Sequence, residues 1–276
     1  MDFGMLSELL FIWIAVLGAI IGSFINALVF RFNSGETMMG RSHCMECKHV
    51  LSVLDLIPFF SYVFLRGKCR YCGEPISLQY PTVEIIGALL AVGVLMLNPL
   101  PLSFLLGFFF WMAVLFATVY DFRYQELPND ALLVIGLTGL ATVFVNCDAE
   151  LCRLVVPNLW SLLSGPLVAL PLLAISAFSR EQAMGWGDGL LMLGFGWMLG
   201  LTGGYSALFI GVWAGAIVGL LMVARERMRA VHAEGSVNGD NKVTMKSRIP
   251  FAPFLALGAL AVYFFHANFL AILLAY

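Results

Sequence analysis

Two aspartates stand where hydrophobic segments of the sequence end or begin. Asp121 ends the apolar run from Gly107 to Tyr120, and Asp188 follows Gly185-Trp186-Gly187 at the start of another run. A carboxylate at a membrane boundary is costly to bury and is therefore a functional candidate. Two carboxylates that share one proton can activate a water molecule to cut a peptide bond. The sequence therefore predicts Asp121 and Asp188 as a catalytic pair, although either could instead be an ordinary helix-end acid.

Glycines occupy positions 185, 187 and 189, on both sides of Asp188. They remove side chains around the acid, so another backbone or an extended substrate can approach it closely. A single Gly-x-Gly-Asp motif occurs in many unrelated contexts. The glycines therefore favour a catalytic interpretation of Asp188 without establishing it.

Four of the six cysteines form two Cys-x-x-Cys pairs that are separated by 21 residues, namely Cys44 with Cys47 and Cys69 with Cys72. Four thiolates suit tetrahedral Zn²⁺, and such a site has no open position, so the metal would be structural. It would hold together a loop that is too short and polar to fold alone. The alternatives are thiol hairpins without metal or a redox pair.

The remaining cysteines, Cys147 and Cys152, lie five positions apart in a separate loop. We expect this loop to lie outside the cytoplasm, where a disulfide is plausible. Two free thiols are the alternative.

Composition identifies the class of protein. The chain has 276 residues, of which 61% are hydrophobic and only 12% are charged, and its mean hydropathy is +0.92. In a soluble domain about a quarter of the residues are charged. The much lower share here predicts a polytopic membrane protein. The net charge of -2 gives no indication of nucleic-acid binding.

The hydrophobic runs predict an all-α protein with about eight transmembrane helices, near residues 9–30, 82–98, 102–120, 131–146, 159–178, 189–201, 204–223 and 252–275. One set of alternate loops holds 14 of the 15 Lys and Arg residues, and only Arg153 falls on the other side. By the positive-inside rule, loops 31–81, 121–130, 179–188 and 224–251 face the cytoplasm, and so do both aspartates. The expected division is a first helix (1–30), a small cytoplasmic zinc-binding loop domain (31–81) and a membrane core (82–276).

Two further features lie near the cysteines. The segment from Val50 to Leu65 is apolar, but it contains Asp55 and Pro58 and is too short to span a membrane. It is expected either to lie in the membrane interface or to pack under the surrounding loop. Glu84 is an acid about one turn into the second predicted span. It could pair with a loop arginine, bind a cationic group or reach the interface.

Taken together, these residues resemble the bacterial type IV prepilin peptidase family, whose members are aspartic proteases of the Gly-x-Gly-Asp type. The resemblance runs through nearly the whole chain and depends on the order and spacing of several motifs. They are Gly22–Asn26, the two cysteine pairs with Ile57-Pro58 and Leu65–Cys69 between them, Ile76-Ser77, Tyr80–Glu84, Asp121 with Pro128-Asn129, Gly185–Asp188 and Ile249–Leu255.

The resemblance implies a bifunctional enzyme of the bacterial inner membrane. It implies cleavage of the basic leader of a type IV prepilin or type II secretion pseudopilin on the cytoplasmic side. It also implies methylation of the new N-terminus from S-adenosylmethionine. Asp121 and Asp188 correspond to the catalytic pair, and the four cysteines correspond to the zinc ligands. Glu84 lies in a segment that is associated with methylation and is assigned to cofactor binding.

Two positions depart from the family pattern. Leu190 replaces a lysine that often follows the second aspartate, and Ala252 replaces a glycine in the C-terminal motif. The missing lysine leaves open how the charge of the aspartate pair is balanced. Two rival interpretations remain: a presenilin-like intramembrane aspartyl protease without methyltransferase activity, and a non-enzymatic zinc-knuckle scaffold or transporter. The presenilin-like rival explains the aspartates but leaves the cysteine loop unexplained, whereas in the scaffold or transporter the acids would be ion ligands.

Overall fold

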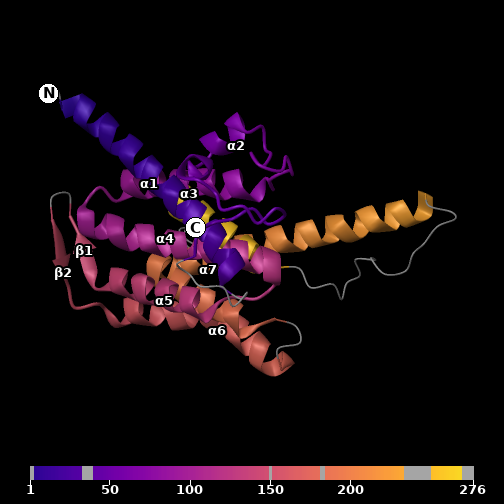
Figure 1. Cartoon of the computed structure of the whole chain (residues 1–276). Helices are drawn as coiled ribbons and strands as arrows, with labels where there is room; N and C mark the ends of the chain where they lie inside the picture. Colours follow the sequence, from indigo (N-terminus) through magenta and orange to yellow (C-terminus); the bar gives the residue numbers. More distant parts are fainter. Residues whose placement is uncertain (1–2, 33–39, 149–150, 181–183, 233–249, 269–276) are drawn as a thin grey trace. The chain divides into compact units, whose positions relative to one another are not determined.

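A computed structural model describes residues 3–32, 40–148, 151–180, 184–232 and 250–268. The chain folds mainly into helices (Figure 1). In chain order the elements are α1 (Phe3–Arg31), η1 (Val53–Leu56), α2 (Phe60–Phe64), α3 (Gln79–Leu97), α4 (Pro101–Tyr124), α5 (Asn129–Val143), β1 (Val145–Cys147), β2 (Cys152–Leu154), α6 (Leu159–Ser179), α7 (Trp186–His232) and α8 (Ala252–Phe265).

Five helices of the described chain are long and apolar enough to cross a membrane. They are α1, α3, α4, α6 and α7, and the apolar part of α7 alone extends over 40 residues. Helices α5 and α8 are also apolar but have only 15 and 14 residues. These helices agree with a multi-pass membrane protein. The number of eight spans stays a prediction, and the part of the last span beyond residue 268 lies outside the described residues.

Helix α7 contains two helical segments that meet at Gly200. This glycine has φ 73° and ψ 178°, a backbone conformation that other residues rarely adopt. A Cβ atom on Gly204 would lie 3.2 Å from the Cα of Gly196. Residues eight apart in a straight helix lie about 12 Å apart, so the chain folds back on itself at Gly200. The break falls close to the boundary predicted between the sixth and seventh spans.

The chain divides into two compact units. The first comprises Met1–Val119 together with Cys147–Arg153, and its principal helix contact joins α1 to α3. Glycines make this contact close: a Cβ on Gly22 would lie 2.8 Å from the carbonyl oxygen of Val83. Small residues at such a seam let two membrane helices approach through their backbones.

The second unit comprises Tyr120–Asn146 and Leu154–Tyr276. In it, α7 packs against α5, α6 and α8. The core is formed by fully buried side chains, which include Ile135, Val168, Leu191, Phe195 and Leu255. Many outward-facing side chains of the same helices are equally apolar, as expected where lipid rather than water surrounds the protein.

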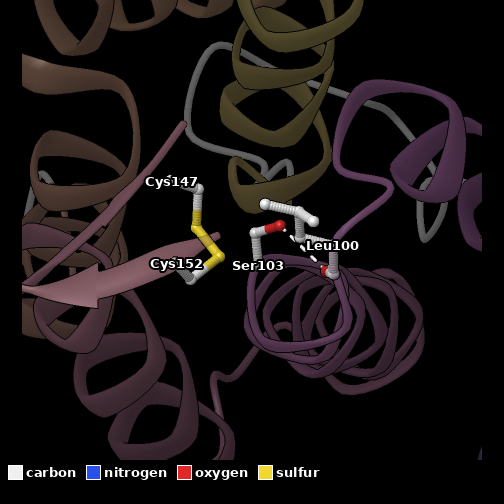
Figure 2. Close-up of a disulfide and its surroundings, with 4 residues drawn as sticks. All are labelled: Leu100, Ser103, Cys147 and Cys152. Carbon is white, nitrogen blue, oxygen red and sulfur yellow. Dashed lines mark hydrogen bonds between the residues drawn. A yellow bond between two sulfur atoms is a disulfide. The ribbon is translucent and has the colours of Figure 1, made fainter. Parts of the chain in front are cut away.

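A two-stranded hairpin, β1 with β2, connects α5 to α6. Cys147 and Cys152 form a disulfide across it, with Cα atoms 4.0 Å apart. Of the two alternatives left open by the sequence, the disulfide is therefore the correct one. Figure 2 draws it with Leu100 and Ser103 from its surroundings, where the Ser103 hydroxyl donates to the Leu100 carbonyl at 3.0 Å.

Candidate active site and metal centre

Asp121 and Asp188 both belong to the second unit, and each lies at the end of a helix. Asp121 is in the last turn of α4 and is only 6% exposed, whereas Asp188 is the third residue of α7 and is half-buried. The negative charge of Asp121 acts on Asp188, so the two carboxylates lie within electrostatic reach of each other. The structure thus brings together two acids that are 67 positions apart in the chain.

The N-terminus of α8 completes the surroundings of Asp121. The backbone N–H of Ala252 donates to Oδ2 of Asp121 at 3.1 Å. The first N–H groups of a helix have no partner within that helix, and the helix dipole makes this end positive. Both features favour a carboxylate. Ala252 therefore contributes through its backbone, and its side chain is not needed for this contact.

Two glycines let other parts of the chain approach the beginning of α7. A Cβ on Gly187 would lie 2.9 Å from Cβ of Leu127, and a Cβ on Gly189 would collide with Cδ2 of Leu173. The Gly-x-Gly-Asp sequence therefore permits close packing beside Asp188 from the segment before α5 and from α6. We infer that these glycines fix where the carboxylate lies, in addition to clearing space for a substrate.

The arrangement of the acids suits one type of chemistry. Two carboxylates in electrostatic contact resist double ionisation, so one can keep a proton while the other is a base. The N-termini of α7 and α8 supply positive partial charge at the same place. Such a pair can activate water and polarise a carbonyl group at once.

The four cysteines come together in the first unit. Their sulfur atoms all lie within 4.8 Å of one another, and those of Cys44 and Cys72 are 3.8 Å apart. Tetrahedral Zn–S bonds of about 2.3 Å would place the sulfurs about 3.8 Å apart. The pKa of the Cys69 thiol is lowered to about 7, chiefly because the backbone N–H groups of Cys72 and Tyr71 point to its sulfur. The donor set and its spacing fit Zn²⁺.

The two cysteine pairs are built in the same way. The N–H of Cys44 donates to the carbonyl of His49, and that of Cys69 donates to the carbonyl of Glu74. The N–H of Lys48 donates to the carbonyl oxygen of Cys44, and the N–H of Gly73 donates to that of Cys69. Lys48 and Gly73 also share a positive φ, of 57° and 77°. Each pair is thus a tight backbone turn that directs two sulfurs to one point.

Asp55 joins the second cysteine pair to the segment between the pairs. Its side chain is 3% exposed and forms an ion pair with Nε of Arg70 at 2.7 Å. Its Oδ2 accepts hydrogen bonds from the Ser52 hydroxyl at 2.7 Å and the Tyr71 hydroxyl at 3.2 Å. Burial opposes ionisation of Asp55, but the hydrogen bonds from Ser52 and the charge of Arg70 outweigh it, and its pKa lies below the usual value. The sequence interpretation missed this role, although a lone acid in an apolar segment was a signal for it.

The ring of Tyr71 also lies against the ring of His49, with centroids 3.7 Å apart. Tyr71 belongs to the second cysteine pair, whereas His49 immediately flanks the first. The contact therefore links the two pairs independently of any metal.

Glu84 lies on the α1–α3 seam and is 7% exposed. Its Oε2 accepts the backbone N–H of Phe59 at 2.7 Å, and its carboxylate also hydrogen-bonds with the side chain of Ser23. One turn away, Asn26 donates to the carbonyl of Tyr80 at 3.1 Å. The fully buried Oδ1 of Asn26 has no hydrogen-bond partner among the described residues. Glu84 therefore ties the cysteine loop to two membrane helices.

Comparison with known proteins gives matches over both units. The sequence profile of the Bacterial Peptidase A24 N-terminal domain matches residues 16–97, which include the four cysteines and Glu84. The profile of the Type IV leader peptidase family matches residues 108–220, which include both aspartates. No solved structure matches the chain significantly.

Several curated proteins named prepilin leader peptidase/N-methyltransferase align with most of the chain. The protein from Burkholderia pseudomallei is 29% identical over 285 residues, covering 94% of this chain and 86% of its own length. The protein from Bacillus subtilis is 27% identical, covering 91% of this chain and 92% of itself. The protein from Pectobacterium carotovorum is 28% identical, covering 89% of each.

Proposed function

The chain belongs to the bacterial type IV leader peptidase family, and on that premise we propose that it cleaves prepilins or pseudopilins and then N-methylates the product. The observation that carries the proposal is that Asp121 and Asp188, two acids at helix ends, lie within electrostatic reach of each other, with the N-terminus of α8 beside Asp121. The presenilin-like alternative is not favoured, because the N-terminal bacterial profile covers the cysteine loop that it leaves unexplained. The scaffold alternative is not favoured, because the peptidase-family profile covers both aspartates.

Cleavage would proceed by an aspartic-protease mechanism. One of Asp121 and Asp188 is ionised and takes a proton from a water molecule, whose oxygen attacks the scissile carbonyl carbon. The other is protonated and donates a hydrogen bond to the carbonyl oxygen. As the tetrahedral species collapses, a proton passes to the leaving nitrogen, which departs as the new N-terminal amine. The Ala252 N–H would hold Asp121 in position through these steps.

Methylation would use the amine that cleavage releases. S-adenosylmethionine, when bound, supplies an electrophilic methyl group, and the neutral amine is the nucleophile. We assign Glu84 to this cofactor site and add Asn26, because the unpartnered Oδ1 of Asn26 offers a buried acceptor on the same seam. The structural Zn²⁺ at Cys44, Cys47, Cys69 and Cys72 would maintain the shape of the loop beside that seam.

The protein is a multi-pass membrane protein. We propose that it lies in the bacterial inner membrane with the aspartates and the cysteine loop facing the cytoplasm, because nearly all Lys and Arg residues occupy that set of loops. We keep the division into a first helix (1–30), a cytoplasmic zinc-knuckle domain (31–81) and a peptidase core (82–276).

Mass spectrometry of a co-expressed prepilin tests both activities together, because it reports the cut position and any methyl adduct. Asp121→Asn and Asp188→Asn should each abolish cleavage. Asp130→Asn is the matched control, because Asp130 is an exposed acid in the first turn of α5. If either active-site variant cleaved as well as Asp130→Asn, the proposed mechanism would be wrong.

A further inference from the structure

The cysteine loop carries an exposed apolar surface that neither proposed activity uses. It consists of η1, α2 and the residues between them, a segment from Val53 to Phe64 that we call the apolar arm. Within it, the side chains of Val53 and Phe64 are 82% and 81% exposed, and those of Leu54, Phe60 and Val63 are more than half exposed. Apolar groups in this number are not left in water without a reason.

The hydrogen bond between Phe59 and Glu84 fixes the level of the arm along α3. Glu84 is the sixth residue of α3, a helix long enough to cross a membrane. At 1.5 Å per residue it lies about 7.5 Å beyond the start of that helix. The 19 residues of α3 extend about 28 Å, close to the thickness of about 30 Å of the hydrocarbon core, so the helix begins near the boundary of that core. Phe59, whose N–H donates to Glu84 at 2.7 Å, therefore lies at the depth of the bilayer.

The backbone at Phe59 is adapted to this contact. Phe59 has φ 61° and ψ -50°, a strained conformation for a residue with a side chain. Its N–H is satisfied by a carboxylate rather than by water, as is required for a backbone group at this depth. The hydrogen bond to Glu84 therefore stabilises the strained backbone of Phe59 at the point where the arm meets α3.

A groove of about 260 Å³ lies on the arm, and its lining consists of Leu54, Ile57, Phe60, Ser61, Phe64, Leu65 and Arg70. Arg66 and Lys68, which follow the lining residue Leu65 in the chain, are exposed, and neither forms an ion pair within the described ranges. An apolar groove beside free cations matches an acyl chain beside an anionic head group.

We propose that the apolar arm inserts into the cytoplasmic leaflet, with lipid acyl chains against its groove and anionic head groups against Arg66 and Lys68. The alternative occupant of the groove is the prepilin helix, which is also hydrophobic. If the proposed function is correct, however, its leader is basic and would be repelled by Arg66 and Lys68. Charge therefore favours lipid.

The full-length protein in vesicles of phosphatidylethanolamine and phosphatidylglycerol can be labelled with a diazirine probe that is confined to the bilayer. Trypsin cuts after Lys48 and Arg66 and releases residues 49–66, which contain the whole arm, as one peptide. Residues 42–48, which contain the first cysteine pair, form the internal control. We expect about tenfold more label in 49–66, because the probe partitions into hydrocarbon.

Two variants test the proposal further, and in both of them trypsin still releases residues 49–66 as one peptide. Phe60→Ser combined with Phe64→Ser should lower labelling of 49–66 several-fold, with zinc content unchanged as the check on folding. Lys68→Glu should lower it in vesicles that contain phosphatidylglycerol but not in phosphatidylcholine alone.

Equal labelling of peptides 49–66 and 42–48 would overturn the proposal. Protection of 49–66 by excess prepilin would overturn it in favour of substrate docking. Neither readout requires cleavage or methylation, so a failure here leaves the proposed function to its own test.

Discussion

The two units of this protein build their sites in opposite ways. In the second unit, the aspartates lie at the ends of packed helices and are positioned by glycines and by the N–H of Ala252. In the first unit, the cysteines lie in a loop in which Cys69 is the one buried residue of the two pairs. There the shape comes from backbone turns, the carboxylate of Asp55 and a site for a metal ion.

The difference indicates what each site depends on. A site made of helix ends should tolerate loss of the metal but not a small increase in side-chain volume. A site made of turns should tolerate changes in helix packing but not loss of the ion or of its polar supports. The following predictions test this comparison, from the largest expected effect to the smallest.

Gly189→Val should have the largest effect. The added atoms collide with the side chain of Leu173 and approach its backbone N, which lies 3.3 Å from the position that the new Cβ would occupy. Overpacking of this kind costs about 2 kcal/mol or more and displaces Asp188, so prepilin cleavage should fall at least about 100-fold. Zinc content of the loop should not change.

Gly136→Ala is the control for this variant. Gly136 lies in α5 of the same unit, and a Cβ there meets no atom within 4 Å. Normal cleavage by Gly189→Val would show that close packing beside Asp188 is dispensable.

Removal of Zn²⁺ by a strong chelator should separate the two activities. Without the ion the cysteine loop should open, because few buried apolar groups hold it. Trypsin should then cut rapidly at Arg66 and Lys68, and methylation of a pre-cleaved pilin should be lost. Cleavage should fall by less than about tenfold, because the aspartates depend on helix packing. Equal loss of both activities would contradict the comparison.

Ala252→Pro removes the N–H that donates to Asp121. Proline is acceptable at the first position of a helix, although it disfavours the helical backbone conformation of Phe251 before it. A hydrogen bond to a charged group contributes about 1.5 kcal/mol or more, so kcat should fall about tenfold. Ala252→Gly keeps the N–H and should retain activity. Thermal unfolding of the two variants should agree within a few degrees if the effect is local.

Asp55→Asn should have the smallest effect. It abolishes the ion pair with Arg70 and weakens the bonds from Ser52 and Tyr71. Since Arg70 is 46% exposed, the loss should be about 1 kcal/mol. We expect zinc to pass to a colorimetric chelator about fivefold faster. Glu46→Gln, at an exposed acid within the first cysteine pair, should not change the rate.

Local patterns in the sequence were enough to predict much of this architecture. The hydrophobic runs located the long helices of the described chain, because each run corresponds to one continuous helical segment. The cysteine spacing predicted the cluster, because each pair is shaped by its own turn. Asp121 and Asp188 stood out because charge is rare beside apolar runs.

Contacts between distant residues were beyond the reach of these patterns. The N–H of Ala252 reaches Asp121 across 131 positions, and a backbone donor leaves no trace in residue type. The bond from Phe59 to Glu84 depends on a positive φ at a phenylalanine, which propensity does not indicate. The sequence did not decide whether Cys147 and Cys152 form a disulfide, because two cysteines in a short loop are compatible with either a bond or free thiols.

The matching turns of the two cysteine pairs have a thermodynamic consequence. Because each turn already aims two sulfurs, a bound Zn²⁺ would not need to organise four independent side chains and would instead act as a cross-link between two prepared halves. Closing the 21-residue stretch between Cys47 and Cys69 restricts the unfolded chain much as a covalent bridge would, which is worth about 3 kcal/mol of chain entropy. If the loop faces the cytoplasm, as we propose, it would gain the benefit of a disulfide in a compartment that would reduce one.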